Sequence, residues 1–403
     1  MDNALYLDNN ATTRVDDAVV AEMLPFFTEY YANPSATYRP GKVVKAAVEQ
    51  ARARVAALVN CRADEVVFTG GGTEADNTAI YSATRCNPGK KRVCCSACEH
   101  PAVAEPMRML REFGYTITPI EPIPYGQPRT GTVTPQAVER AIRAGDPKDV
   151  ALVCVMAANN ETGVVNPAAA IGAVTRNYGV PLLVDATQAV GKVPVDFAAS
   201  GATYMVFSAH KFHGPKGVGA LIVRKDACFK PHLIGGGQEN RCRAGTENVP
   251  GIVGLGMAAE VAQRSLPILN SGVRTVRDIM QNSLVVNFPR GELVIIGRDS
   301  IRTPNTLFFA LRDRNSRMIQ SILDRDGIAI GVGSACSCLK DPKPSATVEA
   351  MKVPRQYALG TIRVSLSKYN APMVCGPDAA QTTISRFTDR LKAALLDRAT
   401  LLR

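Results

Sequence analysis

Between residues 64 and 225, short apolar runs rich in β-branched residues alternate with stretches of helical character. Seven runs are distinct, at residues 66–69, 92–97, 115–120, 150–156, 180–184, 203–207 and 218–223. Several of them are apolar throughout, as expected when helices cover both faces of a strand. The alternation predicts an α/β fold with a mostly parallel, doubly wound, seven-stranded sheet. Because ligands bind at the carboxyl ends of strands in such sheets, the residues that follow each run are the candidates for a functional site.

The pattern changes beyond about residue 265. We interpret four runs as strands and two segments as helices: 293–297, 306–311, 328–332 and 361–367 for the strands, 316–326 and 377–396 for the helices. This mixture is typical of an α+β unit. We therefore expect a large domain at 14–264, which carries the candidate site, and a smaller domain formed by 1–13 and 265–403.

The composition, with 46% hydrophobic and 21% charged residues, is typical of a soluble globular protein. No apolar run reaches the 18 residues of a membrane-spanning helix, and the start MDNALYLDNN lacks the regions of a secretory signal. The eleven cysteines are odd in number and irregularly spaced, which argues against a disulfide framework and favours a reducing compartment. We expect a cytoplasmic protein with no membrane partner.

The formal net charge of +11 is spread along the chain, without a run of five or more Lys and Arg residues. Such diffuse charge identifies neither an acidic partner nor a nucleic acid. A basic RNA-binding protein without catalytic activity is the alternative from another functional class. No RNP or KH motif and no interleaving of aromatic and basic residues supports it, so we expect no specific nucleic-acid partner.

Cys95 and Cys98 form a CxxC pair in the segment CCSAC, and His100 follows closely. These residue types bind zinc, but a second CxxC at the spacing of a zinc site is missing. Cysteine also serves as a small apolar residue in buried strands. We favour the buried strand and expect no metal site.

Polar residues collect directly after five of the predicted strands. They are Gly72 and Thr73, then His100, then Asn160, then Asp185 and Gln188, and finally Ser208, His210 and Lys211. Singly, each has an ordinary alternative as a helix cap or turn residue. Together they supply phosphate donors, an imidazole, a carboxylate and a lysine amine. This set fits pyridoxal 5′-phosphate, whose aldehyde needs a lysine amine and whose ring nitrogen needs a carboxylate.

The chain resembles the cysteine desulfurases of the NifS/IscS type, which are fold-type-I pyridoxal-phosphate enzymes of the class V aminotransferase family. The matching segments run in family order over nearly the whole chain. They are YLDNNATT (6–13), NPSATYRPGK (33–42), FTGGGTEADN (68–77), CEHPAV (98–103), NNETGVV (159–165), VDATQAVGK (184–192), SAHKFHGPKGVGA (208–220), GGGQENRCRAGTEN (235–248), GSAC (333–336) and IRVSL (362–366).

The resemblance implies a role for each candidate. Lys211 would bind the cofactor aldehyde as a Schiff base and then act on the substrate, and His100 would stack on the ring and take part in catalysis. Asp185 would pair with the ring nitrogen, and Gln188 and Asn160 with the ring hydroxyl oxygen. Asn160 and Arg363 would bind the substrate, with Arg363 holding the substrate's carboxylate. Gly72, Thr73, Ser208 and His210 would hold the phosphate, joined by Thr246 from a neighbouring subunit, which implies a homodimer. Lys192 and Lys216, the other lysines near Lys211 in the sequence, are expected to face the surface.

The resemblance also assigns the nucleophile. Cys336 in GSAC matches the cysteine that takes sulfur from L-cysteine as a persulfide and leaves L-alanine. A nearby second cysteine, Cys338, has no counterpart in the family. We interpret it as inert, the alternatives being a sulfur acceptor or a residue that protects Cys336 by reversible oxidation.

The chain departs from the family at three places. SCLKDPKPS follows Cys336 where relatives have a stretch ending in Leu-Glu-Pro-Ser, and Tyr38 replaces a common histidine. The loop leaves selenocysteine lyase, with the same fold and motifs, as the nearest alternative function. The resemblance implies a sulfur-acceptor protein, with iron–sulfur scaffolds among the candidates, although the tail that docks such scaffolds is not recognisable in LDRATLLR.

Overall fold

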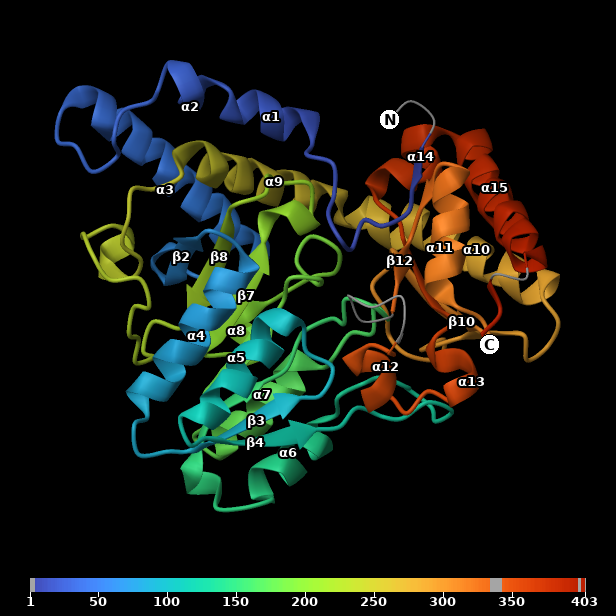
Figure 1. Cartoon of the computed structure of the whole chain (residues 1–403). Helices are drawn as coiled ribbons and strands as arrows, with labels where there is room; N and C mark the ends of the chain where they lie inside the picture. Colours follow the sequence, from blue (N-terminus) through green and yellow to red (C-terminus); the bar gives the residue numbers. More distant parts are fainter. Residues whose placement is uncertain (1–3, 334–342, 398–399, 403) are drawn as a thin grey trace.

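A seven-stranded sheet, with strand order β2-β8-β7-β6-β5-β3-β4, forms the centre of the part of the molecule on the left of Figure 1. The computed structural model describes residues 4–333, 343–397 and 400–402. The strands of this sheet are β2 (Val66–Thr69), β3 (Arg92–Ser96), β4 (Thr116–Ile120), β5 (Val150–Cys154), β6 (Leu182–Asp185), β7 (Tyr204–Ser208) and β8 (Gly219–Val223). Only β8 runs antiparallel to its neighbours, and the other pairs are parallel. The predicted α/β fold with its mostly parallel sheet is confirmed.

Helices cover both faces of this sheet, which explains why inner strands such as β5 are apolar and buried throughout. Cys94 and Cys95 in β3 illustrate the arrangement, because successive side chains of a strand point to opposite faces. Cys94 packs into the cluster that includes α3 and α9, whereas Cys95 packs into the cluster that includes α4 and α5. Both cysteines are buried, as expected of a strand that uses cysteine as a small apolar residue.

The helices of four or more residues are spread over the whole described chain. They are α1 (Asp17–Met23), α2 (Pro25–Thr28), α3 (Arg39–Val59), α4 (Gly72–Cys86), α5 (Pro101–Glu112), α6 (Pro135–Arg143), α7 (Ala168–Asn177), α8 (Phe197–Ser200), α9 (Val249–Ile268), α10 (Arg274–Asn287), α11 (Ser316–Arg325), α12 (Ala346–Ala350), α13 (Arg355–Ala358), α14 (Pro372–Cys375) and α15 (Pro377–Leu396). A π-helical turn at Leu269–Val273 joins α9 directly to α10. The expected domain boundary at 264 and 265 therefore falls inside continuous helix, and the division into two domains stays a prediction.

A second sheet of four strands lies on the right of Figure 1, with the order β12-β13-β10-β9. Its strands are β9 (Leu293–Ile295), β10 (Thr306–Leu311), β12 (Gly331–Val332) and β13 (Thr361–Ser365), all antiparallel to their neighbours. Side chains of α10, α11 and α15 pack with this sheet into one apolar cluster, which also contains Leu7. The N-terminal segment thus packs with residues from the last third of the chain.

The single strand predicted at 328–332 is wrong, because the chain changes partner within it. β11 (Ile328–Ala329) pairs in parallel with the N-terminal β1 (Leu5–Tyr6), whereas β12 pairs with β13. Ile330, between the two short strands, is buried. The segment therefore reads as one apolar run while it serves two sheets.

Cys86 and Cys228 form a disulfide that joins the C-terminal end of α4 to the segment after β8. This pair differs from the expectation of reduced cysteines, although a single bridge is no disulfide framework. The seven other cysteines of the described chain are free thiols. Irregular spacing could not reveal the pair, since 142 residues separate its two members.

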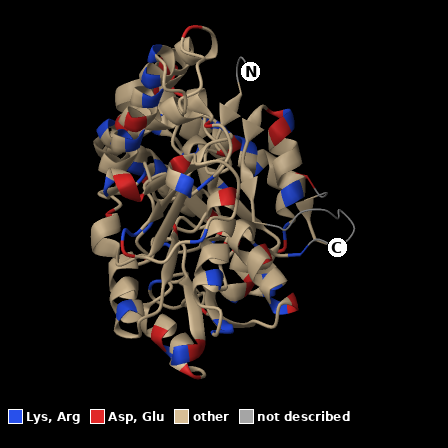
Figure 2. Ribbon diagram, turned by 90° about the vertical axis from the view of Figure 1, so that its left-hand side faces the viewer, with Lys and Arg blue, Asp and Glu red and all other residues tan. Residues whose placement is uncertain are grey.

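Lys and Arg residues are interspersed with Asp and Glu residues over the ribbon in Figure 2. Among the described residues, no helix combines the length and the apolar character that crossing a bilayer requires.

Candidate active site

Ten of the predicted site residues line one pocket of about 700 Å³. They come from the carboxyl ends of five strands, where ligands of doubly wound sheets bind, and from β13 of the second sheet. The ten are Gly72, Thr73, His100, Asn160, Asp185, Gln188, Ser208, His210, Lys211 and Arg363. The structure therefore brings these side chains together, while the roles assigned to them stay predictions.

One end of the pocket has the features of an anion site. α4 begins at Gly72, and its first turn presents N–H groups that have no partner within the helix. The preceding residue, Gly71, has φ = +149°, which a residue with a side chain would adopt only with strain. The hydroxyl of Ser208 and the ring of His210 line the same pocket. Desolvation, with the nearby charge of Lys211, lowers the pKa of His210 to about 4, so this ring is neutral near pH 7.

Asp185 lies at the end of β6 and is only 6% exposed. Its carboxylate accepts the N–H of Thr187 at 2.9 Å. Two further buried acids lie near it: burial and the charge of Asp185 raise the pKa of Glu99 to about 8 and that of Asp76 well above its ordinary value. Glu99 is therefore mainly neutral near pH 7, and burial disfavours the charged form of Asp76 as well. Both effects limit the negative charge that gathers around Asp185.

The amine of Lys211 is held in the pocket by the N-terminal segment. Its Nζ donates to the carbonyl oxygens of Asn10 and Ala11 at 2.9 and 2.8 Å. Desolvation, followed by the charge of Arg363, lowers the pKa of Lys211 to about 8. A sizeable fraction of this amine is therefore unprotonated near neutral pH, as a lysine nucleophile or base requires.

The expectation that Lys192 faces the surface is wrong. Lys192 is 5% exposed, and its Nζ donates to Oε1 of Gln188 and to Oδ1 of Asn10. Local sequence gave no sign of this burial, because Asn10 lies 182 residues away. Lys216 is exposed, as expected, although it lies at the pocket.

Arg363 projects from β13 between two partners. Its Nη1 donates to the carbonyl oxygen of Asn160 at 2.7 Å, and its Nη2 pairs with Oδ1 of Asp8 at 2.7 Å. Nε is buried and has no hydrogen-bond partner among the described residues. These two bonds use two of the five N–H donors of the guanidinium, so each Nη atom keeps a second N–H for a ligand with acceptor oxygens, such as a carboxylate.

Asp8 and Asn10 are the site residues that the sequence reasoning missed. Both belong to the segment YLDNNATT, which the resemblance includes without assigning a role to any of its residues. Asp8 positions Arg363, whereas Asn10 contacts Lys211, Gln188 and Lys192. The only sequence signal was a group of polar residues next to a short apolar run.

Cys336 and Cys338 lie in the segment 334–342, outside the described residues. The described residues on either side of this segment lie close to the site. The N–H of Ser345 donates to the carbonyl oxygen of Gly333 at 2.8 Å, and the Ser345 hydroxyl donates to Oε2 of Glu161 at 2.6 Å. Since Glu161 directly follows Asn160, the chain enters and leaves the segment beside a residue of the site.

Thr246 is exposed on the connection between β8 and α9 and does not line the pocket of its own chain. Its predicted contact with a phosphate therefore needs a second subunit and stays a prediction. Among the described residues, no group of three or more His, Cys, Asp or Glu side chains could hold a metal ion.

The comparisons with known proteins agree with this geometry. The model of the aminotransferase class-V family matches residues 5–372. A cysteine desulfurase from Gluconacetobacter diazotrophicus is 41% identical over 91% of this chain and 90% of its own length. A cysteine desulfurase from a Nostoc species is 40% identical over 97% and 94%. The solved structure of a NifS-like protein superposes with a TM-score of 0.86 at 32% identity, covering 97% of this chain and all of the other.

These matches confirm the resemblance on which the assignments of the site were based. They extend over the segments that carry Lys211, Asp185 and Arg363. The chain therefore belongs to the aminotransferase class-V family, in the group of the NifS-type cysteine desulfurases.

Proposed function

We propose that this protein is a pyridoxal-phosphate-dependent cysteine desulfurase, which converts L-cysteine to L-alanine and leaves the sulfur on Cys336 as a persulfide. The observation that carries the proposal is the single pocket in which Lys211, Asp185, the start of α4 and Arg363 meet. The relatives that share about two fifths of the sequence over most of the chain are cysteine desulfurases.

The residues of the pocket fit the cofactor. The first turn of α4 with Ser208 and His210 would hold a phosphate, since these groups are donors around a helix N-terminus. Asp185 would hold the protonated ring nitrogen, and Gln188 and Asn160 would face the ring oxygen. His100 would stack on the ring. Once bound, pyridoxal phosphate supplies an electron sink for the α-carbon of the substrate.

The protein's own groups perform the remaining steps. Arg363, held by Asp8 and Asn160, binds the carboxylate of L-cysteine and fixes its orientation. The Lys211 amine removes the proton from the α-carbon, for which its lowered pKa is suited. The Cys336 thiolate then attacks the substrate sulfur, so that an S–S bond forms while the C–S bond breaks. The electron pair of the C–S bond stays with the substrate carbon, which takes up a proton and becomes alanine.

The test of this proposal is the conversion of L-cysteine by the purified protein loaded with pyridoxal phosphate, with alanine as the measured product. L-Selenocysteine on the same preparation tests the alternative, which the unusual segment after Cys336 leaves open. Comparable or slower turnover of selenocysteine supports the desulfurase, whereas turnover of selenocysteine alone would replace it by a selenocysteine lyase. An acceptor thiol, which we propose is that of a sulfur-acceptor protein, then attacks the outer sulfur of the persulfide, so that the S–S bond breaks and the Cys336 thiolate is released.

Arg363→Lys is expected to lower kcat/KM for L-cysteine about 10- to 100-fold, because lysine keeps the charge but loses the planar fork that holds a carboxylate. Most of the loss should be in KM. Arg312→Lys is the matched control, since Arg312 is exposed and its guanidinium lies beside Asp313. The measurement is the steady-state kinetics of the two variants. An Arg363→Lys enzyme with the same kinetics as the control would refute the assignment of Arg363 to substrate binding.

We also propose that the protein acts as a homodimer in which Thr246 reaches the phosphate bound to the partner subunit. Thr246→Ala should release the cofactor faster than the wild-type protein but still bind it, because one hydrogen bond to a charged group contributes about 1.5–3 kcal/mol. Thr382→Ala, at an exposed position of α15, serves as the control. Cofactor release is measured by absorbance at protein concentrations above and below dimer dissociation. A monomer that keeps its cofactor as well as the dimer does would rule out the role across subunits.

A further inference from the structure

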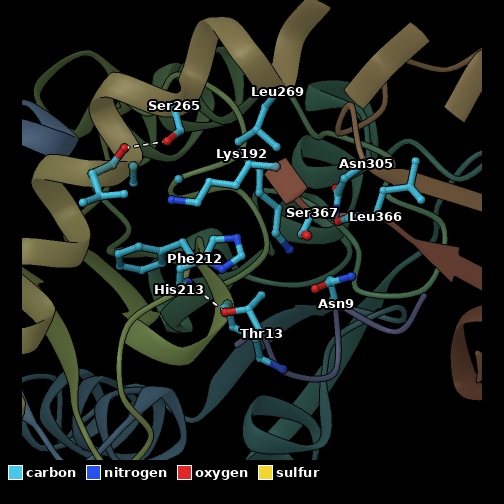
Figure 3. A pocket seen from close by; sticks show the side chains of 15 residues that line it. Asn9, Thr13, Lys192, Phe212, His213, Ser265, Leu269, Asn305, Leu366 and Ser367 are labelled. Atoms are coloured by element: carbon cyan, nitrogen blue, oxygen red, sulfur yellow. Dashed lines mark hydrogen bonds between the residues drawn. The ribbon is translucent and has the colours of Figure 1, made fainter. Parts of the chain in front are cut away.

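Lys192 carries a buried amine that takes no part in the proposed mechanism. It lines a small cavity of about 20 Å³, together with Lys211, Phe212 and His213 (Figure 3). Such a volume holds about one water molecule, so bulk solvent does not hydrate the amine. Burial, with the charges of Lys211 and Arg363, lowers the pKa of Lys192 well below the ordinary value, and no acid is among the groups that shift it. A buried amine without an acidic partner costs stability unless it makes hydrogen bonds.

The hydrogen bonds of Lys192 determine the orientation of Gln188. Lys192 Nζ donates to the Gln188 side chain, and a lysine amine acts here as a donor, so the carboxamide must turn its oxygen, Oε1, toward Lys192. The other end of the carboxamide, Nε2, then donates to the carbonyl oxygen of Asn10 at 2.9 Å. Gln188 lines the 700 Å³ pocket. With its oxygen bonded to Lys192 and one N–H to Asn10, the second N–H of Nε2 is the donor that the carboxamide can offer to a ligand there.

The Lys192 amine also holds the side chain of Asn10 in place by a hydrogen bond. Oδ1 of Asn10 accepts from Lys192 Nζ and from Asn305 Nδ2, both at 3.0 Å. The Asn10 carbonyl oxygen in turn accepts from Lys211 Nζ at 2.9 Å. Asn10 thus connects Lys192 to the amine of Lys211, whereas Lys192 contacts Gln188 directly.

We propose that Lys192 is a positioning residue of the reaction, which holds the Gln188 carboxamide so that an N–H donor, and not the amide oxygen, faces the ring oxygen of the cofactor. The inference rests on the proposed function. With Lys192 removed, only the hydrogen bond from Nε2 to the carbonyl oxygen of Asn10 still orients the carboxamide. Its oxygen then has no partner, so the carboxamide is held less firmly and can turn its oxygen toward the ring oxygen of the cofactor.

The test uses the pH at which the visible absorbance band of the cofactor-loaded protein changes. Lys192→Met keeps the length of the side chain and removes its donors. A donor on the ring oxygen favours the negatively charged form of that oxygen, so losing the donor should raise the pH of the transition by about one unit. Lys148→Met, at an exposed position, controls for the loss of one positive charge. Lys192→Leu, which also lacks a donor and is shorter, replaces Lys192→Met if that variant does not fold, with the same upward shift expected.

A double-mutant cycle separates positioning from a merely structural role. If Lys192 acts through Gln188, then Lys192→Met should produce little further shift in a Gln188→Ala background, because residues that act as one unit are not additive. The proposal is overturned if Lys192→Met titrates like the wild-type protein, or if the shift is the same in both backgrounds. A wild-type protein that binds pyridoxal phosphate without a visible band would instead overturn the proposed function, and this outcome is distinct from the other two.

Discussion

Lys211→Ala is expected to lower alanine production from L-cysteine by about a thousandfold or more, because the substitution removes the group that we propose takes the proton from the α-carbon. It should also abolish covalent attachment of the cofactor. The geometry supports one attachment site, since the Lys211 amine lies in the pocket beside Asn10 and Ala11 with its pKa lowered to about 8.

Borohydride reduction of the loaded protein, followed by mass spectrometry of its peptides, measures the attachment. Lys192 is the relevant competitor, because it is buried beside Gln188 and Asn10. The expected result is a reduced adduct on Lys211 in the wild-type protein and on no lysine in Lys211→Ala. Lys148→Ala, which removes an exposed lysine, should keep both the adduct and the activity. An adduct on Lys192 or Lys216 in Lys211→Ala, together with turnover, would refute the assignment of Lys211.

Cys336→Ala is expected to stop alanine formation from L-cysteine while leaving the cofactor in place. The residues that we propose hold the cofactor are Lys211, Asp185 and those at the start of α4, all outside the segment that contains Cys336. Removal of sulfur, in contrast, needs a thiolate to attack it. A selenol is the stronger acid and its bond to carbon is weaker, so some activity on L-selenocysteine should remain.

The measurement is alanine formed from each of the two substrates, with mass spectrometry of the peptide that contains residue 336. Cys338→Ala is the matched control and should retain activity on both substrates, because we interpret Cys338 as inert. Sulfur bound to Cys338 in the Cys336→Ala protein, with turnover of cysteine near that of the wild type, would transfer the role to the second cysteine.

Local sequence predicts the large sheet well, because burial on both faces leaves a signal within each strand. The runs at 150–156 and 203–207 match β5 and β7 to within two residues. The same reasoning places polar residues such as Asp185 and Lys211 at strand ends, and the topology then gathers them in one pocket. The run at 328–332 shows the limit of this approach, since hydrophobicity does not indicate which strand each half of a run pairs with.

The parts of the site that could not be predicted depend on contacts between distant segments. Lys192 follows a helical turn and precedes Val-Pro-Val-Asp, a context typical of the surface, and only Asn10 and the cavity beside Lys211 explain its burial. Asp8 and Arg363 pair across 355 residues of sequence. No periodicity or spacing encodes such pairs, because they arise when the N-terminal segment packs between the two sheets.

The most direct test of the account is a single turnover of the wild-type protein, loaded with pyridoxal phosphate and mixed with L-cysteine in the absence of reductant. Alanine is quantified, and the peptide that contains Cys336 is weighed by mass spectrometry in the same sample. We predict one alanine per active site, matched by one added sulfur atom on Cys336. Alanine formed without sulfur on Cys336, or a loaded protein that forms no alanine, would contradict the account.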